Sequence, residues 1–343
     1  MTTEHSNRWL HRFAVFTAVA TLFLIWVGGL VTSHGVGMSV PDWPTTYGYN
    51  MFFFPFSQWV GGIFYEHSHR LTASGVGLLT VILAVWLWMK DPRPWVRHLG
   101  LVAVVLVCLQ GLLGGLRVIQ LKDEIGIFHA TLAQLFFALM CAIALFTSRR
   151  WREAKLSVYD TGSVRYLYLL ATGMILLQLI IGASMRHQHA GLAIPDFPLA
   201  YGRILPATDA AALDSYNASR VEVSAANPIT ASGVWLQMAH RFTALLIAVL
   251  VGIAATKTWK RFGWSSAFTK GAMFWTGLIL VQALLGAATI WTNKSADIAT
   301  LHVAFGALGL ITGTTLILWA YRCFQTSEAH HVALAVEKGE VLA

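Results

Sequence analysis

A carboxylate and an imidazole stand three residues apart near the start of one apolar run, where Glu66 precedes His69 and Arg70. On a helix, residues three apart lie on the same face, one turn from each other. Ionisable side chains at the end of a membrane span are costly and mark functional sites by default. The pair therefore has the residue types for proton transfer or metal ligation.

The same pattern returns later in the chain with one change. His240 and Arg241 repeat the imidazole and the guanidinium, but Gln237 stands where the first copy has its acid. An amide takes up no proton near neutral pH, whereas a carboxylate in a low-dielectric site can be tuned toward a general base. The sequence therefore predicts two similar sites, and it assigns proton chemistry to the one that contains Glu66.

Each copy also has a second histidine, His129 in the first and His302 in the second. A single histidine on an apolar helix is more often a satisfied polar group than a ligand, but equivalent positions in two copies favour ligation. Two facing imidazoles between bundle helices, with no added carboxylate or cysteine, suit an axially ligated haem iron. Zinc would need three or four ligands, and no third donor is common to both copies.

Arg70 and Arg241 directly follow two of these histidines. An arginine in the outer headgroup region can bind a haem propionate bidentately, so both are candidates for propionate binding. The alternative is an interfacial arginine whose stem lies in lipid and whose head reaches water.

The elements that must position these residues are membrane helices. Of the 343 residues, 56% are hydrophobic and only 12% are charged, so most of the chain lies in lipid. The formal charge of +8 does not indicate a nucleic-acid partner, because the basic residues fall in short loops between apolar runs. Runs of about 20 apolar residues span a bilayer. Eight such runs are predicted, at 13–32, 67–89, 97–118, 127–147, 166–185, 236–256, 269–291 and 299–320.

Basic residues set the orientation of these spans. They concentrate before the first span, in the alternate loops that follow the second, fourth and sixth spans, and after the eighth span. Cytoplasmic loops carry this excess, so both termini are predicted to be cytoplasmic and the four histidines to lie toward the external face. The first run is too long for a signal peptide and reads as a retained span of a bacterial plasma membrane.

The chain is an internal duplication. Residues 37–48 recur as 191–202, and the segments at 69–73, 110–114 and 127–130 recur in the same order at 240–244, 282–286 and 300–303. Parallel repeats of this kind predict a pseudo-two-fold axis along the membrane normal. The predicted fold is therefore all-α, with eight transmembrane helices in two tandem four-helix bundles. The predicted divisions are a first repeat at 1–148, a cytoplasmic linker at 149–165, a second repeat at 166–325 and a cytoplasmic tail at 326–343.

The outer loops after the first and fifth spans are long and share a Pro-Asp-aromatic-Pro core, at 41–44 and 195–198. A structural turn fits this core, because Pro fixes φ and Asp can accept bonds from nearby backbone donors. The alternative is a cover over an outer-face cofactor. His34, His187 and His189, offset between the copies, are expected to be polar residues of the outer surface.

These features together resemble the haem A synthase family of membrane enzymes, which convert haem O to haem A for terminal oxidases. The resemblance covers the eight spans, the tandem repeats, the outer Glu-x-x-His-Arg and the four histidines. It implies that His240 and His302 hold a resident haem b and that His69 and His129 bind the substrate haem O. It also implies that Glu66 is the catalytic acid and base. Some members have a cysteine pair in an external loop, and this chain has no cysteine in the loops predicted to be external.

The predicted reaction is oxidation of the C8 methyl group of haem O to a formyl group, with electron transfer between the two haem sites. The implied partners are haem O and haem A, membrane lipid, an electron donor or acceptor, a haem O synthase and the assembling terminal oxidase. Two alternatives remain at this stage: a dihaem b-type electron carrier without substrate chemistry, and a haem transporter or insertion factor. The acid in only one copy favours the enzyme.

Overall fold

The computed structural model describes residues 7–154, 158–159, 162–220 and 227–325. In this part of the chain, eight helices are long and apolar enough to cross a membrane. They are α1 (Arg8–Ser33), α2 (Gly61–Lys90), α3 (Pro94–Gln120), α4 (Asp123–Thr147), α6 (Ser163–His187), α8 (Ala231–Phe262), α9 (Ala267–Trp291) and α10 (Ala296–Cys323). The all-helical fold class and the eight predicted spans are confirmed.

Several helices extend a turn or more beyond the apolar run that predicted them, because their ends are set by capping residues. The Asn7 side chain accepts hydrogen bonds from the first-turn amides of α1, and Thr230 does the same for α8. Pro94 occupies the first turn of α3, where its missing N–H has no cost. Glu66 consequently lies in the second turn of α2, with a helical turn before it.

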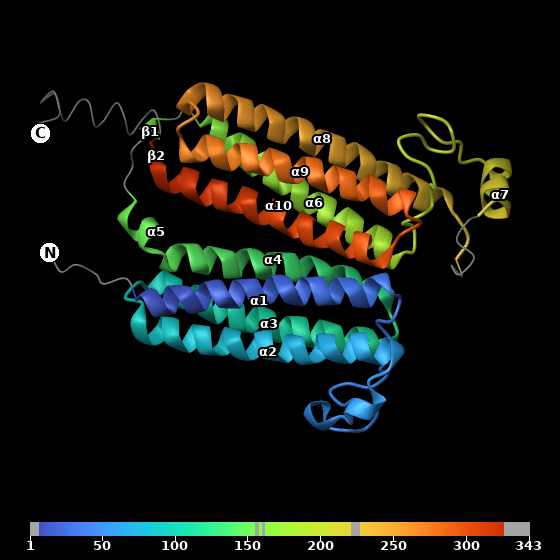
Figure 1. The fold of residues 1–343 in the computed structure, drawn as a ribbon, viewed down its shortest axis with the longest axis horizontal. Helices are drawn as coiled ribbons and strands as arrows, with labels where there is room; N and C mark the ends of the chain where they lie inside the picture. Colours follow the sequence, from blue (N-terminus) through green and yellow to red (C-terminus); the bar gives the residue numbers. More distant parts are fainter. Residues whose placement is uncertain (1–6, 155–157, 160–161, 221–226, 326–343) are drawn as a thin grey trace, which may run out of the picture.

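The eight long helices form two rings of four (Figure 1). Helix α1 contacts α2 and α4, and α3 closes the first ring; α6 contacts α8 and α10, and α9 closes the second. The rings meet where α1 contacts α10, α4 contacts α6, and α4 contacts α10. Exchanging the repeats leaves this set of contacts unchanged, which is consistent with a pseudo-two-fold relation.

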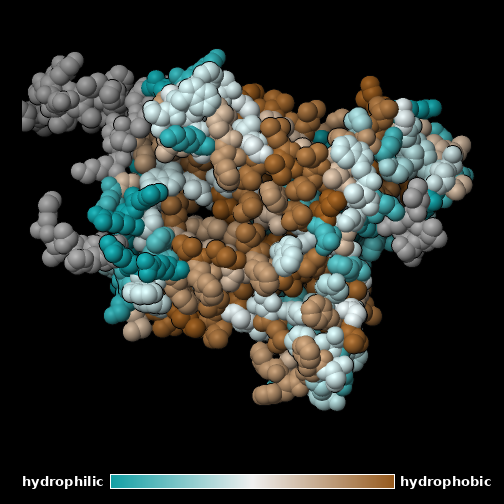
Figure 2. All heavy atoms as spheres, viewed as in Figure 1, coloured by the Kyte–Doolittle hydropathy of each residue, from teal (hydrophilic) through white to brown (hydrophobic). Residues whose placement is uncertain are grey.

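Each ring has its own apolar core. One core joins Leu10, Leu83 and Met140, and the other joins Tyr168, Trp275 and Leu310. Between the rings is a small third cluster of buried apolar side chains. Apolar side chains also cover the outer surface of the helices, and hydrophilic residues gather toward the two ends (Figure 2). A surface of this kind is suited to lipid.

The remaining elements lie at the two ends of the bundle. Two short 3-10 turns, η1 (Met51–Phe53) and η2 (Phe56–Gln58), belong to the first outer loop, and α7 (Ala210–Ala218) belongs to the second. The start of α1 and the end of α10 lie at the opposite end, where α5 (Arg149–Glu153) follows α4 (Figure 1). Two-residue strands β1 (Val158–Tyr159) and β2 (Phe324–Gln325) pair in parallel there. Most of the predicted linker is described, and the predicted tail at 326–343 lies outside the described residues.

Candidate functional site

Glu66 links α2 to the first outer loop. Its side chain is only 5% exposed, and its two oxygens have different partners. Oε1 accepts a hydrogen bond of 2.8 Å from Arg70 Nη2, and Oε2 accepts one of 2.8 Å from the Val40 amide. The spacing of four residues places Arg70 one helical turn away, which brings the two side chains into contact.

Arg70 holds the same loop through backbone carbonyls. Nη1 donates to the carbonyls of Asp42 (2.6 Å) and Thr45 (3.0 Å), and Nη2 donates to the carbonyl of Val40 (2.8 Å). With the bond to Glu66, four of the five guanidinium N–H groups are taken up. The Nε–H is therefore the donor of Arg70 that these contacts leave for a ligand.

Asp42 folds the loop that Arg70 binds. Its carboxylate accepts hydrogen bonds from the amides of Tyr47 (2.8 Å) and Gly48 (2.9 Å) and from the Thr45 hydroxyl (2.5 Å). Burial raises the pKa of Asp42, but these hydrogen bonds outweigh burial and hold the pKa below its ordinary value. Tyr47 adopts a φ of 50°, a conformation that a tight turn requires. The Pro-Asp-aromatic-Pro core thus forms the turn expected from its sequence.

The second outer loop has the same turn. Asp196 accepts hydrogen bonds from the amides of Tyr201 (2.7 Å) and Gly202 (2.8 Å). Arg241 Nη2 donates to the Asp196 carbonyl at 2.7 Å, and Nη1 donates to the Leu199 carbonyl at 2.8 Å. The turn and its arginine are therefore equivalent in the two repeats.

The side chain at the position of Glu66 bonds its outer loop differently in the two repeats. Gln237 accepts a hydrogen bond of 2.7 Å from the Ile194 amide and donates one of 3.1 Å to the Ile194 carbonyl. Glu66 accepts from the equivalent amide, that of Val40, but has no donor for the carbonyl, which Arg70 satisfies instead. One repeat therefore closes its loop with a neutral amide and the other with an ion pair.

The four predicted histidines form two facing pairs. His69 of α2 and His129 of α4 have ring centroids 6.5 Å apart, and their planes are inclined at 73°. His240 of α8 and His302 of α10 have centroids 6.3 Å apart at 60°. The structure thus brings together the residues that the sequence paired.

A glycine of a neighbouring helix faces each of these rings. A methyl group at Gly28 of α1 would lie 3.0 Å from His69 Nε2, and one at Gly182 of α6 would lie 3.2 Å from His240 Cε1. Gly114 and Gly286 face the other two rings, with distances of 3.4 and 3.1 Å from such a methyl to Cε1. A larger residue at these positions would push the imidazole away from its partner.

Three glutamines fix the helix backbone at the histidines. Gln110 donates to the carbonyl of His129, and Gln282 donates to that of His302. Gln178 of α6 donates to the carbonyl of His240 at 2.9 Å. By repeat alignment Leu24 occupies the equivalent position in α1, so the backbone at His69 lacks this support.

The imidazoles have ring nitrogens available for a metal. Nδ1 of His129, His240 and His302 is buried and has no hydrogen-bond partner among the described residues. A buried polar atom without a hydrogen-bond partner is costly. A metal ion bound to a ring nitrogen would give that nitrogen a partner. Metal–imidazole bonds are about 2 Å long, so two imidazoles on opposite sides of one metal ion have centroids about 6 Å apart. Both pairs therefore fit axial ligation of a haem iron.

The other outer histidines differ from one another in exposure. His34 and His189 are exposed, as expected from the sequence. The same expectation is wrong for His187, whose side chain is 7% exposed and lies against Gly126 of α4. It is buried because α6 packs on α4 between the rings, a contact that the sequence pattern does not reveal.

His67, next to the proposed ligand His69, is also buried. It forms a hydrogen bond of 3.2 Å with the Thr46 hydroxyl and contacts the rings of Phe54 and Trp59. It therefore anchors the first outer loop and lies on a different face of α2 from His69.

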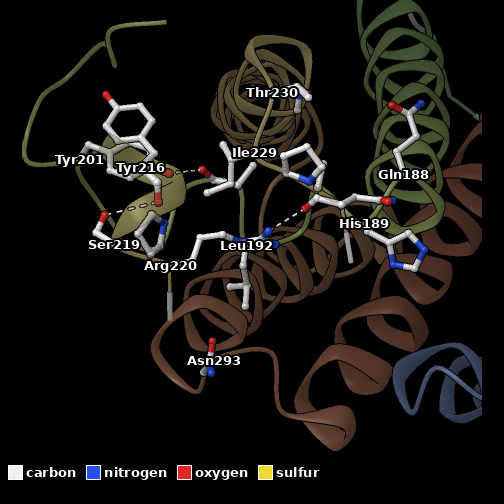
Figure 3. Close-up of a pocket in the computed structure, with 16 residues that line it drawn as sticks. Gln188, His189, Leu192, Tyr201, Tyr216, Ser219, Arg220, Ile229, Thr230 and Asn293 are labelled. Atoms are coloured by element: carbon white, nitrogen blue, oxygen red, sulfur yellow. Dashed lines mark hydrogen bonds between the residues drawn. The ribbon is translucent and has the colours of Figure 1, made fainter. Parts of the chain in front are cut away.

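A separate cavity of about 70 Å³ lies in the second outer loop, lined by residues that follow α6 and α7 and by the start of α8 (Figure 3). Tyr201 and Tyr216 stack at one side of it with ring centroids 3.4 Å apart, and Ser219 and Arg220 directly follow α7. A buried water occupies about 30 Å³, so the cavity has room for a few waters and not for a porphyrin. It is distinct from both histidine pairs.

The fold and the site define a multi-pass membrane protein of two four-helix units. Each unit has one pair of facing histidines and an outer loop that is held by an arginine. The chain belongs to the family of cytochrome oxidase assembly proteins named COX15-CtaA, whose pattern matches residues 11–314. This match confirms the family resemblance predicted from the sequence.

Several similar proteins are named Heme A synthase. The protein of Geobacillus kaustophilus is 27% identical over 314 residues, which cover 88% of this chain and 87% of that protein. The protein of Shouchella clausii is 26% identical over 304 residues (86% and 92%), and that of Bacillus cereus is 28% identical over 314 residues (87% and 89%). The chain therefore resembles these proteins over nearly its whole length.

Proposed function

We propose that this protein is a haem A synthase, which oxidises the C8 methyl group of haem O to a formyl group and gives haem A for terminal oxidases. The observation that carries the proposal is the carboxylate of Glu66 in one of two similar sites, where the other has the neutral amide of Gln237. An electron carrier has no need for this difference. Family membership and the similarity to proteins named Heme A synthase support the same function.

The two histidine pairs have different roles in this proposal. His69 and His129, on the helices that present Glu66, bind the substrate haem O. His240 and His302, in the repeat with the neutral amide, hold a resident haem b. When bound, haem b supplies a centre that takes up and releases single electrons.

Glu66 is the proton acceptor and donor of the reaction. With water as the source of the formyl oxygen, oxidation of a methyl group to a formyl group releases four protons and four electrons. A buried carboxylate one helical turn from His69 can take up the protons in turn, and an electron acceptor takes the electrons. Arg70 holds Glu66 Oε1, so it orients the carboxylate while the Val40 amide fixes the other oxygen. The outer loop at 40–48 covers this side of the site and limits the access of water.

Arg70 and Arg241 remain candidates for propionate binding as well. Arg70 has its Nε–H left for a ligand, and the two bonds of Arg241 leave three N–H groups. Both side chains lie directly after a histidine of a pair, at the external end of the span. A propionate that points outward would reach this level of the protein.

The orientation in the membrane follows from the charge of the loops. We infer that the protein lies in a bacterial plasma membrane with both termini cytoplasmic and both histidine pairs toward the external face. Haem O and haem A would enter and leave from lipid or from partner proteins. A haem O synthase, the assembling oxidase and an electron donor or acceptor are the partners that the reaction requires.

The decisive experiment is extraction and chromatography of haems from membranes that contain this chain and a source of haem O. We expect haem A from the wild type. His240→Ala or His302→Ala should lower the haem b content of the purified protein, and His69→Ala or His129→Ala should leave haem b bound while haem O accumulates. Membranes without haem A, or a protein without Soret absorbance after reconstitution, would contradict the proposal.

A further inference from the structure

Arg117 is a cation held within the outer end of the first bundle. Its side chain is 16% exposed, and Nη2 donates a hydrogen bond of 3.1 Å to Asp123. Nε is buried and has no hydrogen-bond partner among the described residues. A methyl group at Gly37 would lie 2.8 Å from Nη1, so the guanidinium lies under the first outer loop.

Arg186 reaches from the second bundle to the first. Its Nη2 donates to the Gly29 carbonyl of α1 at 2.7 Å and to the Ser33 hydroxyl. Ser33 in turn forms a hydrogen bond of 2.9 Å with Thr300 of α10. The acceptors of Arg186 are thus neutral oxygens, and no carboxylate pairs with it in the part of the chain that the structure describes.

The two guanidiniums lie within range of each other's charge, and among the described residues Asp123 is the acid that contacts one of them. Asp123, which is 39% exposed, is shared with His187 and His189, whose nitrogens lie 4.0 and 3.6 Å from its oxygens. Arg117 and Arg186 repel each other electrostatically, and the acid neutralises at most one of them. An uncompensated charge at the end of a membrane span is costly, so an anion bound at this cluster would stabilise it.

The cluster lies between the two histidine pairs. Arg117 lies about one helical turn after Gly114, which faces His129, and Arg186 bonds Ser33, which in turn bonds Thr300, two residues before His302. The Gly29 carbonyl accepts a hydrogen bond from Arg186, and Gly29 directly follows Gly28, which faces His69.

The cluster is also present only once in the repeat pattern. By repeat alignment, Thr289 replaces Arg117 and Thr32 replaces Arg186. A general device for holding outer loops would be repeated, as Arg70 and Arg241 are. The single copy indicates a ligand that is bound on one side of the interface.

We propose that Arg117 and Arg186 form an anion site between the two bundles, which binds a carboxylate of the tetrapyrrole held by His69 and His129. The assignment of this carboxylate to haem rests on the proposed function. An inorganic oxyanion such as phosphate has the same chemistry and is the other source that the site accepts. Guanidinium groups bind both bidentately.

The test compares iron protoporphyrin IX with its dimethyl ester, in which both carboxylates are neutral. Each is titrated into the detergent-solubilised full chain and followed by Soret absorbance. We expect the wild type to bind the diacid about 10- to 100-fold more tightly than the ester, the factor for a charged hydrogen bond. Arg117→Gln and Arg186→Gln should reduce this preference with little effect on the ester, and the remaining preference should come from Arg70 and Arg241. Arg203→Gln, on the exposed part of the second outer loop, should retain the full preference.

A second arm separates the two sources of the anion. If the wild type binds diacid and ester equally, but phosphate raises its thermal stability and not that of the glutamine variants, the site takes a free anion. If neither the diacid nor phosphate distinguishes the wild type from these variants, the proposal is overturned. The wild-type comparison needs no variant to fold, and Arg186→Lys, which keeps the charge, should keep part of the preference. Because the readout is binding, loss of haem A formation alone would refute the proposed function and leave this site standing.

Discussion

Replacing Glu66 by Gln removes the negative charge of the carboxylate. The second repeat shows how an amide fits this position, because Gln237 is equivalent to Glu66. In that repeat Gln237 accepts from the Ile194 amide at 2.7 Å and donates to its carbonyl at 3.1 Å. An amide at position 66 can bond the Val40 amide and carbonyl in the same way. Glu66→Gln should therefore fold with its outer loop closed.

The cost of this substitution can be worked from the bonds that change. The bond from Arg70 to the carboxylate is lost, and bonds to charged groups contribute about 1.5–3 kcal/mol. One neutral amide–carbonyl bond is gained, which contributes about 0.5–1.5 kcal/mol. Arg70 keeps its three carbonyl acceptors but loses its buried counter-charge, and breaking a buried ion pair costs about 3–5 kcal/mol in total. This is below the roughly 5–15 kcal/mol that is typical of a folded domain, so most of the protein should stay folded.

The chemical effect should be much larger than the structural one. Loss of a general acid and base lowers rates by about 10²–10⁴-fold. Membranes that contain Glu66→Gln and a haem O source should keep haem b and accumulate haem O or a partly oxidised haem, as measured by extraction and chromatography. Haem A at the wild-type level from this variant would remove Glu66 from the mechanism.

Gln237→Glu is the matched control. Its carboxylate would lie one helical turn before Arg241, which has three N–H groups left by its two bonds to loop carbonyls, so an ion pair like that of Glu66 and Arg70 can form. The Ile194 carbonyl would lose one neutral donor, which contributes about 0.5–1.5 kcal/mol. We expect a loss of stability under about 2 kcal/mol and unchanged haem b content, measured by thermal unfolding and Soret absorbance, and a variant that fails to fold or loses haem b would contradict this electrostatic account.

Three further perturbations follow from the same contacts. Gly28→Ala places a methyl group 3.0 Å from an imidazole nitrogen and should reduce haem binding in the first repeat, whereas Gly182→Ala should reduce haem b in the second; unchanged Soret spectra would argue against the glycine cradle. Asp42→Asn should destabilise the first outer loop at neutral pH. Because the folded pKa of Asp42 is depressed, its contribution is complete above the ordinary value of about 3.9 and is lost as the pH falls through the lower folded value. Thermal unfolding of wild type and variant should therefore converge in acid, and a constant difference would refute this. Asp91→Asn removes a buried partner of Arg152 and should lower the free energy of unfolding by about 3–5 kcal/mol, measured by thermal or denaturant unfolding. A loss under about 1 kcal/mol would contradict this expectation.

Much of the fold could be predicted because it depends on patterns that are local in the chain. Apolar runs of spanning length give the eight helices, and basic loops predict their orientation. The duplication makes His69 equivalent to His240 and His129 equivalent to His302. It also shows that Glu66 has no acidic counterpart, because Gln237 occupies the equivalent position. The ends of helices were less predictable, since caps such as Asn7 decide them rather than hydropathy.

The sequence by itself determined the membrane class, the repeat, the histidine quartet and the position of the single acid, because residue type and spacing along one helix are sufficient for each. Only the tertiary structure decided which groups face them. The glycines opposite the imidazoles, the loop carbonyls on Arg70, the burial of His187 and the reach of Arg186 to α1 all come from neighbouring segments. These contacts join residues that are distant in the chain, so the packing of one helix against another determines them and no local periodicity encodes them.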